Sequence, residues 1–385
     1  MEQVIRVFIA LVRSEICGTA LEPEVIRMIT PKMLEQLYIV SRNHDMIHVV
    51  AVALKKHKLL SNDRLTQKYT QFMYMALMRY EAMKHEEEQI AKVFEQEGIV
   101  FVPLKGSVIR RYYPSAWMRT SSDIDILIHE EDLKRAKNAL VKHLNYAEGR
   151  HKYHDFSLYS PNGILLELHF RIVENEEDLD KNLKKVWDYV RPVEEGGCRY
   201  EMTPEYLMFH AFAHMVYHFR YGGCGVRFVT DIWLLDKKLS YDENILQKLC
   251  KESKIGHFVK CVRKLSKVWF EEENYDSTCR RMEFYIITGG VFGSTESKIT
   301  ARKIQTKGNL KYFFQRVFIP YKEFCASYPR LEKMPFLYPY YTVKRWLKIF
   351  NKQIARNAVR EITINRKIGQ DDVDELKRLF KELKV

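Results

Sequence analysis

The spacing of hydrophobic residues changes along the chain, from a helical period to short strand-like runs and back to a helical period. In the first stretch the apolar positions recur every three or four residues, which predicts helices. Pro31 directly after Thr30 is typical of a helix start, with Thr30 as the N-cap. The stretch from Asp63 to Glu97 contains neither proline nor glycine and predicts one long helix or a broken pair, ending at Gly98.

Short apolar runs replace the helical spacing after this point and predict a small sheet. The runs Ile99–Leu104 and Ile124–Ile128 have the length of strands. Two further runs, Phe156–Ser160 and Ile164–Phe170, flank the turn residues Pro161-Asn162-Gly163. This arrangement predicts a β-hairpin.

The helical period returns at Thr203-Pro204-Glu205, where an N-cap residue, a first-turn proline and an acid follow one another. The predicted helix carries His210, His214 and His218 at four-residue spacing, and two histidines four residues apart can bind zinc. No HExxH motif is present, and half-buried core histidines are common. We favour the interpretation as core residues and keep the zinc site as the alternative.

These changes of pattern divide the chain into four predicted regions. They are a helical N-terminal region (1–97), a strand-containing region (98–200), a helical bundle (201–288) and a basic helical C-terminal region (289–385). The predicted fold class is α+β, with a small mixed sheet and its helices flanked by helical N-terminal and C-terminal regions.

Length and composition are those of a globular protein. The chain has 385 residues, enough for two or three domains, with 46% hydrophobic and 13% aromatic residues. No apolar stretch approaches the roughly 18 residues of a membrane span, and the first residues do not form a signal peptide. Seven cysteines without a close CxxC pair predict reduced thiols, so we expect a cytoplasmic protein that makes no membrane contact.

The net charge of +13 is concentrated near the C-terminus. Residues 298–367 contain 17 Lys or Arg and three acids, which indicates an anionic partner for this segment. Within it, Lys348, Lys352 and Arg356 belong to a run of cations every four residues along a predicted helix. Such a run is either the solvated face of an ordinary helix or a contact for phosphate or nucleic acid, and we consider both.

Candidate chemistry begins with Asp123-Ile124-Asp125 at the start of a predicted strand. Side chains two residues apart in a strand project to the same face, so the two carboxylates would lie together and repel each other. Mg²⁺ between them would relieve this repulsion, since it prefers carboxylate and phosphate oxygens. Gly106-Ser107 would open a helix whose free N–H groups can receive a phosphate. The alternative for the aspartates is a solvated strand edge.

The order Lys105-Gly106-Ser107, Tyr113-Pro114, Arg119 and Asp123-Ile124-Asp125 resembles the polymerase-beta-like nucleotidyltransferases. More narrowly, it is similar to a family of largely uncharacterised bacterial nucleotidyltransferases with the pattern LKG, YP, R and DIDLL. The resemblance implies a palm-type sheet in which Gly106 and Ser107 hold the triphosphate, with Lys105 or Arg119 as added charge. Here 15 residues separate Ser107 from Asp123, more than is usual in the wider superfamily, which makes the pose of the turn less defined than the aspartate pair.

The resemblance also implies a third carboxylate on a later strand. Glu167 is the single acid in the apolar run Ile164–Phe170, where a buried carboxylate needs a cation or a hydrogen-bonding partner. We therefore expect Glu167 to complete the metal site, with an edge-strand residue facing water as the alternative. His169, two residues after Glu167, projects from the same face of the predicted strand and could line the site. The family pattern further includes histidines followed by an aspartate, here His214 and Asp231, which could help to close the nucleotide site.

The predicted function is transfer of a nucleoside monophosphate from a nucleoside triphosphate, such as ATP, to an acceptor, with release of pyrophosphate. Asp123 and Asp125 would hold two Mg²⁺ ions, one on the triphosphate and one, completed by Glu167, on the acceptor hydroxyl. The acceptor is an RNA end, a protein side chain or a small molecule, and the sequence favours none strongly. A module that binds nucleotide or RNA without catalysis is the competing hypothesis. The oligomeric state is not predicted.

Overall fold

The computed structural model describes residues 2–60, 64–174, 176–290, 300–301, 321, 331, 334–347 and 370–385. The predicted anion-binding residues Lys348, Lys352 and Arg356 lie outside these ranges, as does most of the basic segment around them. The described C-terminal elements are the turn η5 (Pro335–Leu337) and the helices α18 (Tyr338–Leu347) and α20 (Gln370–Leu383).

The N-terminal part is helical, as the apolar spacing predicts. Thr30 caps the third helix, because its side-chain oxygen accepts a hydrogen bond from the backbone N–H of Met33 at 3.2 Å. The stretch before Gly98 forms one continuous helix of 33 residues rather than a broken pair. The helices are α1 (Glu2–Cys17), α2 (Pro23–Met28), α3 (Pro31–Asn43), α4 (Ile47–Lys56) and α5 (Arg64–Gln96).

A five-stranded mixed sheet follows, in the order β1-β2-β5-β4-β3. Its one parallel pair is β2 with β5, and the other neighbours are antiparallel. The predicted hairpin is confirmed as β4 paired with β5. The strands are β1 (Phe101–Pro103), β2 (Asp123–Ile128), β3 (Ala147–His151), β4 (Asp155–Tyr159) and β5 (Leu165–His169).

Short helical segments join the strands. The β1–β2 connection contains α6 (Gly106–Ile109) and the turns η1 (Arg110–Tyr112) and η2 (Ala116–Met118), and the β2–β3 connection contains η3 (Glu130–Asp132) and α7 (Leu133–Leu144). After β5 come α8 (Glu177–Leu183), η4 (Val186–Tyr189) and a small second sheet of β6 (Val190–Pro192) and β7 (Tyr200–Met202).

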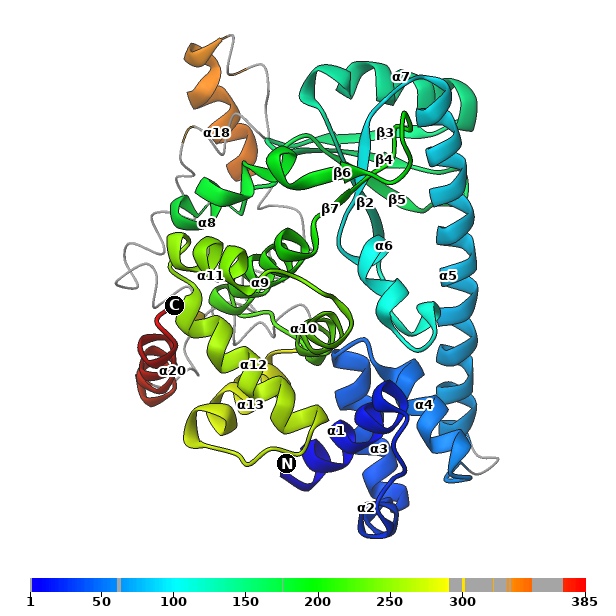
Figure 1. Cartoon of the computed structure of the whole chain (residues 1–385), viewed down its shortest axis with the longest axis vertical. Coiled ribbons are helices and arrows are strands. Elements are labelled where there is room, and N and C mark those ends of the chain that lie inside the picture. Colours follow the sequence, from blue (N-terminus) through cyan, green and yellow to red (C-terminus); the bar gives the residue numbers. More distant parts are fainter. Residues whose placement is uncertain are drawn as a thin grey trace.

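The two faces of the main sheet have different roles. Ile124, Ile126 and Ile128 of β2 point to one face and are buried in a hydrophobic core that also contains residues of α5 and α7. Figure 1 shows α5 running along the edge of the molecule beside the sheet and α7. The alternation of a strand therefore sends the intervening residues, Asp123 and Asp125 among them, to the opposite face.

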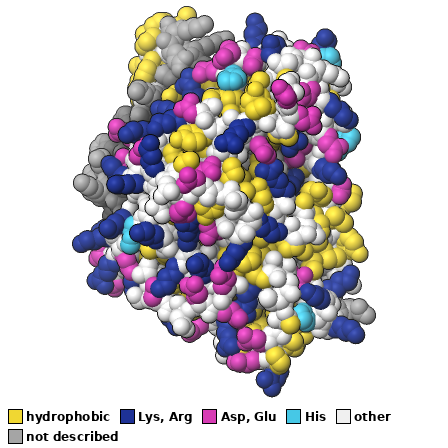
Figure 2. Space-filling view, viewed as in Figure 1, with side chains coloured by type: hydrophobic (Ala, Val, Ile, Leu, Met, Phe, Trp, Pro, Cys, Tyr) yellow, Lys and Arg dark blue, Asp and Glu magenta, His cyan; other side chains and the backbone are white. Residues whose placement is uncertain are grey.

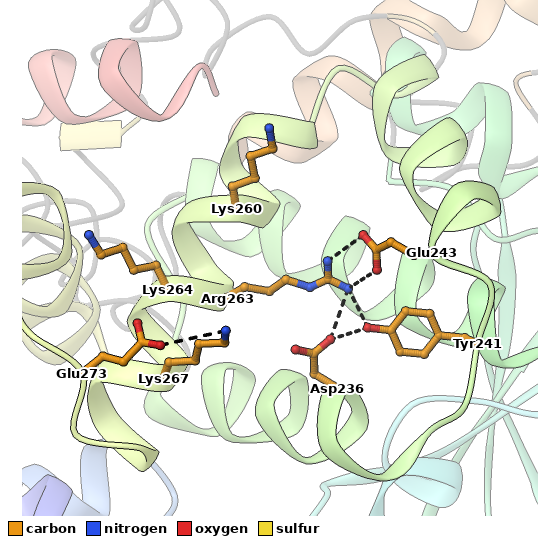
Figure 3. Close-up of a pocket in the computed structure, with 8 residues that line it drawn as sticks. All are labelled: Asp236, Tyr241, Glu243, Lys260, Arg263, Lys264, Lys267 and Glu273. Atoms are coloured by element: carbon orange, nitrogen blue, oxygen red, sulfur yellow. Dashed lines mark hydrogen bonds and ion pairs between the residues drawn. The ribbon is translucent and has the colours of Figure 1, made fainter.

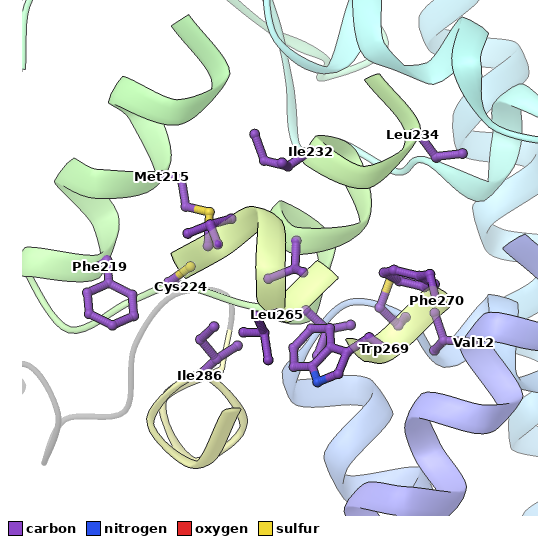
Figure 4. Close-up of a cluster of buried hydrophobic side chains, with 14 of the residues drawn as sticks. Val12, Met215, Phe219, Cys224, Ile232, Leu234, Leu265, Trp269, Phe270 and Ile286 are labelled. Atoms are coloured by element: carbon purple, nitrogen blue, oxygen red, sulfur yellow. The ribbon is translucent and has the colours of Figure 1, made fainter. Parts of the chain in front are cut away.

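A second, larger hydrophobic core holds most of the other described helices together. It contains residues of α1, α3 and α4 together with residues of the C-terminal half of the chain, and Figure 4 shows its centre around Trp269, Leu265 and Phe219. The two helical regions that the sequence separates thus share one core, and the four-part domain division stays a prediction. The helices of the second half are α9 (Pro204–Arg220), α10 (Val226–Lys238), α11 (Glu243–Glu252), α12 (Gly256–Phe270) and α13 (Ser277–Gly289).

The α+β fold class is confirmed as a small mixed sheet flanked by helices. Pro204 and Glu205 lie in the first turn of α9, as predicted, and Thr203 is the N-cap residue. The Thr203 side chain, however, makes no capping hydrogen bond. Within the described residues, no helix combines the length and the hydrophobicity that crossing a bilayer requires.

Candidate functional site

The parallel pairing of β2 with β5 brings the predicted carboxylates together. In this register Asp125 lies directly opposite Glu167, and Asp123 lies opposite Leu165. Because residues i and i+2 share a face, Asp123, Asp125 and Glu167 all project from the face that is turned away from α5 and α7. The sheet therefore holds three carboxylates in one patch on adjacent, rigid strands.

Asp125 is the most deeply placed of the three, with 4% of its surface exposed. One of its oxygens, Oδ1, lies 2.7 Å from the Lys105 ammonium and 2.7 Å from His169 Nε2. Burial acts to raise the pKa of Asp125, but Lys105 and His169 outweigh it and hold this pKa far below its usual range. Asp125 is thus an anion at any physiological pH.

Glu167 and Asp123 complete the patch. The Glu167 carboxylate accepts a hydrogen bond from Lys152 Nζ at 2.9 Å and has His169 Nε2 at 3.8 Å. Burial raises the pKa of Asp123 above its usual range, and the negative charge of Asp125 adds to this effect. The two neighbouring aspartates therefore repel each other, as the spacing in the sequence predicts.

A sharp turn after β1 places Lys105 at this patch. Its backbone has φ 45° and ψ −118°, a conformation that L-residues rarely adopt, and the turn is fixed because Leu104 N–H donates to the carbonyl of Asp125 at 2.9 Å. This strained backbone conformation places the Lys105 ammonium on the Asp125 carboxylate. We expected Lys105 beside phosphates, and the structure places it on a carboxylate that could bind metal.

The turn Gly106-Ser107 differs from the expected phosphate cradle. The helix that follows, α6, has only four residues, and Ser107 N–H is already bonded to the Leu104 carbonyl at 3.2 Å. The Ser107 hydroxyl donates to Glu87 of α5 at 2.7 Å. At Gly106, an added Cβ would lie 3.0 Å from the Cβ of Ser121, so a larger residue here would crowd the Ser121 side chain.

Arg119 also differs from its expected role as added charge for phosphates. Its Nε and Nη2 donate to both carboxylate oxygens of Asp231 at 2.8–3.0 Å, and its Nη1 donates to the Thr120 carbonyl at 2.6 Å. The Tyr113 hydroxyl donates to the same carboxylate at 2.6 Å. All these side chains are buried. Arg119 therefore fixes the segment before β2 to helix α10, and Asp231, expected to help close the site, is its partner.

The helix α9 carries the three histidines, and one of them, His214, lies 2.9 Å from Glu174. Burial lowers the pKa of His210, His214 and His218 to about 3 in each case, so the imidazoles are neutral at physiological pH. For His210 and His214, the charges of Lys105 and Asp125 also act on the pKa. Within the described residues, the three histidines form no metal-ligand group together. The core interpretation fits this placement better than a zinc site.

Three residues of the site were not foreseen from the sequence. Lys152 binds Glu167 from the loop between β3 and β4, Glu87 binds Ser107 from α5, and Glu174 lies 2.9 Å from His214 Nδ1. Each comes from an element distant in sequence from its partner. No motif or spacing in the sequence identifies these three residues. Only Glu174 could have been suspected, because it closely follows the predicted strand that contains Glu167.

The patch has the donor atoms for a divalent cation. Ligand atoms of Asp125, Glu167 and His169 all lie within 4.8 Å of one another, and Asp123 adds a further carboxylate on the same face. The acidic donors are oxygens, which suit Mg²⁺. The ammonium groups of Lys105 and Lys152 are the positive charges that offset the carboxylates in this structure.

An open pocket of about 470 Å³ lies away from this patch, between α11, α12 and the end of α10. Figure 3 shows that several of its charged side chains pair with one another. Arg263 contacts Glu243 at 2.8 Å and Asp236 at 3.1 Å, and Lys267 contacts Glu273 at 3.9 Å. Figure 2 likewise shows Lys and Arg mixed with acidic side chains over the visible face. None of the three carboxylates of the sheet lines this pocket.

Comparisons with known proteins identify a family for this chain. A family model described as uncharacterised nucleotidyltransferase matches residues 31–271, from the start of α3 to the end of α12. No curated protein matches this chain. Among solved structures, an antigenic nucleotidyltransferase-like protein from Paracoccidioides brasiliensis is similar over 49% of this chain and 92% of its own, with a TM-score of 0.33 and 13% sequence identity.

Proposed function

This chain belongs to the family of uncharacterised nucleotidyltransferases, and we propose that it transfers a nucleoside monophosphate from a nucleoside triphosphate to an acceptor hydroxyl, releasing pyrophosphate. The observation that carries the proposal is the β2–β5 register, which sets Asp125 opposite Glu167 with Asp123 on the same face. Three carboxylates on one rigid face suit the binding of a nucleotide–metal complex. We assign the sheet to the polymerase-beta-like palm type on this basis.

Two Mg²⁺ ions are part of the proposal. Asp123 and Asp125 would hold both, and Glu167 would complete the coordination of one. When bound, these ions supply positive charge that offsets the charge of the phosphates and lowers the pKa of an acceptor hydroxyl. His169, whose Nε2 shares a hydrogen bond with Asp125 Oδ1, would orient that carboxylate rather than act on the substrate.

The other residues of the site bind and position the substrate. Lys105 supplies positive charge beside Asp125 for the triphosphate, and Gly106 lets the chain approach closely at the turn. Ser107 would have to exchange its hydrogen bond with Glu87 for one with a phosphate oxygen. Arg119 acts through Asp231 by fixing the segment that leads into β2.

The test is nucleotidyl transfer by the purified protein. Each of the four nucleoside triphosphates, labelled at the α-phosphate, is incubated with the protein, Mg²⁺ and a cell extract, and both released pyrophosphate and labelled macromolecules or metabolites are measured. We expect Mg²⁺-dependent label transfer that Asp125→Asn abolishes. The control is Asp178→Asn, which removes an exposed carboxylate paired with Lys254 and should leave transfer unchanged.

The competing hypothesis is a module that binds nucleotide without catalysis. It predicts nucleotide binding by the wild-type protein without pyrophosphate release for any of the four nucleotides and any acceptor in the extract. That outcome would refute the transferase proposal.

The acceptor is proposed to be RNA because positive charge is concentrated in residues 298–367. Each phosphate contact releases counterions, so the affinity for RNA should fall with salt with a logarithmic slope of about −0.7 to −0.9 per contact. Replacing Lys348, Lys352 and Arg356 with glutamine should flatten the slope by up to about three units and leave nucleotide binding unchanged. A slope near zero with tRNA or bulk RNA would point to a small-molecule acceptor instead.

A further inference from the structure

Glu174 is a largely buried carboxyl group to which the proposed function above gives no role. It lies in the connection between β5 and α8, five residues after His169, and its side chain is 13% exposed. Its Oε1 shares a hydrogen bond with Nδ1 of His214 at 2.9 Å. Its backbone N–H donates to Asp180 of α8 at 2.7 Å, which fixes the main chain at this point.

Charged and titratable groups from every neighbouring element face this carboxyl. They are Lys105 from the turn after β1, His154 from the segment before β4, His169 from β5, His214 and His218 from α9, and Asp180 from α8. The ammonium of Lys105 acts on Glu174 and also contacts Asp125 at 2.7 Å. Glu174 and Asp125 are therefore both under the electrostatic influence of one ammonium group.

The partner of Glu174 is a neutral base, not a counter-ion. Burial lowers the pKa of His214 to about 3, and Lys105 adds to this effect. Burial likewise raises the pKa of Glu174 to about 7, against the opposing effects of Lys105 and His218. The carboxyl group of Glu174 can therefore gain and lose a proton near neutral pH, as general acid–base catalysis requires.

A nearby glutamate shows the contrasting structural arrangement. Glu176 accepts hydrogen bonds from Arg220 at 2.8 Å and from the Tyr221 hydroxyl at 3.0 Å. Arg220 neutralises the charge of Glu176, and this ion pair fixes the β5–α8 connection to α9. Among the described residues, no Lys or Arg forms an ion pair with Glu174, and its hydrogen-bond partner is the imidazole of His214.

We propose that Glu174, oriented by His214, is the general base that takes the proton from the acceptor hydroxyl. The inference rests on the proposed nucleotidyl transfer. As the acceptor oxygen forms its bond to the α-phosphorus, the bond from that phosphorus to the β-phosphate bridging oxygen breaks, and pyrophosphate leaves with the electron pair. The acceptor proton passes to the Glu174 carboxylate and is released to water before the next turnover.

The test measures pyrophosphate release from a nucleoside triphosphate with water as the acceptor, in saturating Mg²⁺, between pH 5 and 9. The wild-type rate constant should rise with pH to a plateau, with a midpoint near 7, because only the ionised carboxylate accepts a proton. Glu174→Gln should lower the plateau about 10²- to 10⁴-fold and abolish the rise. Its affinity for a non-reactive α,β-methylene nucleotide should be unchanged, since the base acts on the acceptor.

Two further variants separate catalysis from folding. Glu176→Gln removes a carboxylate two residues away and should keep the wild-type rate and pH profile. His214→Ala removes the imidazole hydrogen-bonded to Glu174, so the plateau rate should fall while the dependence on pH remains. If Glu174→Gln does not fold, Glu174→Asp is used, because it retracts the carboxyl group by one methylene and should lower the rate while keeping the pH dependence.

The outcomes distinguish this inference from the function on which it rests. The role of Glu174 is overturned if the wild-type protein releases pyrophosphate and Glu174→Gln keeps the same rate and pH profile. A wild-type rate in Glu174→Asp would also overturn it. Both results leave the proposed nucleotidyl transfer intact. If the wild-type protein binds the nucleotide analogue and releases no pyrophosphate to water or to any acceptor in a cell extract, the proposed function itself fails.

Discussion

Replacing Asp231 with alanine tests whether the guanidinium of Arg119 serves the fold or a ligand. The Asp231 carboxylate accepts three hydrogen-bond contacts from Arg119, at 2.8, 3.0 and 2.8 Å, and one from the Tyr113 hydroxyl at 2.6 Å. The side chains of Arg119 and Asp231 are 9% and 6% exposed. Water therefore cannot replace the carboxylate without a rearrangement of the surrounding residues.

The expected loss of stability follows from these contacts. Removing one partner of a buried ion pair costs about 3–5 kcal/mol, because the remaining charge is left without a counter-ion. The Tyr113 hydroxyl also loses its acceptor, which adds about 1 kcal/mol or more. We expect Asp231→Ala to lower the free energy of unfolding by about 4 kcal/mol or more.

Urea unfolding followed by far-UV circular dichroism measures this loss. The control is Glu201→Ala, which breaks the exposed pair of Arg111 and Glu201 at 3.0 Å, with side chains 47% and 45% exposed, and should cost less than about 1 kcal/mol. The double change Arg119→Met with Asp231→Leu removes both buried charges, so it should cost less than Asp231→Ala alone.

The result for nucleotide binding decides the role of Arg119. If Asp231→Ala were no more destabilising than Glu201→Ala and bound nucleoside triphosphate more tightly than the wild-type protein, the freed guanidinium would be acting on phosphates. That outcome would refute the structural role assigned to Arg119.

Three further predictions concern the carboxylate patch and its turn. In calorimetry without Mg²⁺, Asp123→Asn should raise the temperature of unfolding because it relieves the repulsion between the two aspartates. Asp125→Asn should lower this temperature because the contacts with the Lys105 ammonium and the His169 imidazole are lost. Shifts of both variants in the same direction would contradict the assigned contacts. Glu167→Gln should spare nucleotide binding and slow pyrophosphate release by orders of magnitude, and weaker binding with an unchanged rate constant would place the third ligand elsewhere. Gly106→Ala should cost about 1–3 kcal/mol in urea unfolding because its Cβ meets Ser121, while the control Gly256→Ala, with no heavy atom within 4 Å, should not destabilise the protein.

Local patterns in the sequence predicted much of the fold correctly. The Thr30 cap, the long helix before Gly98 and the hairpin of β4 and β5 are all confirmed. Membership in a nucleotidyltransferase family, expected from the stretch around Asp123 and Asp125, is also confirmed. These features depend on residues close together in the sequence, where periodicity, turn residues and capping side chains determine the conformation.

The partners of individual side chains could not be predicted in this way. Lys105 and Arg119 are cations beside a phosphate-binding pattern, and the sequence indicates a ligand role for both. Their contacts with Asp125 and Asp231 join residues 20 and 112 positions apart. Which anion a buried cation contacts depends on the packing of whole elements, and a buried charge takes the partner that this packing provides.

The sequence by itself determined that Asp123 and Asp125 share one face of a strand, because that relation follows from the two-residue period of a β-strand. Only the tertiary structure decided that Glu167 lies opposite Asp125, since strand order and register arise from burial of the apolar face against α5 and α7. It also decided that α9 brings His214 against Glu174. Such contacts between distant segments form only when the elements pack, and no local preference of the chain encodes them.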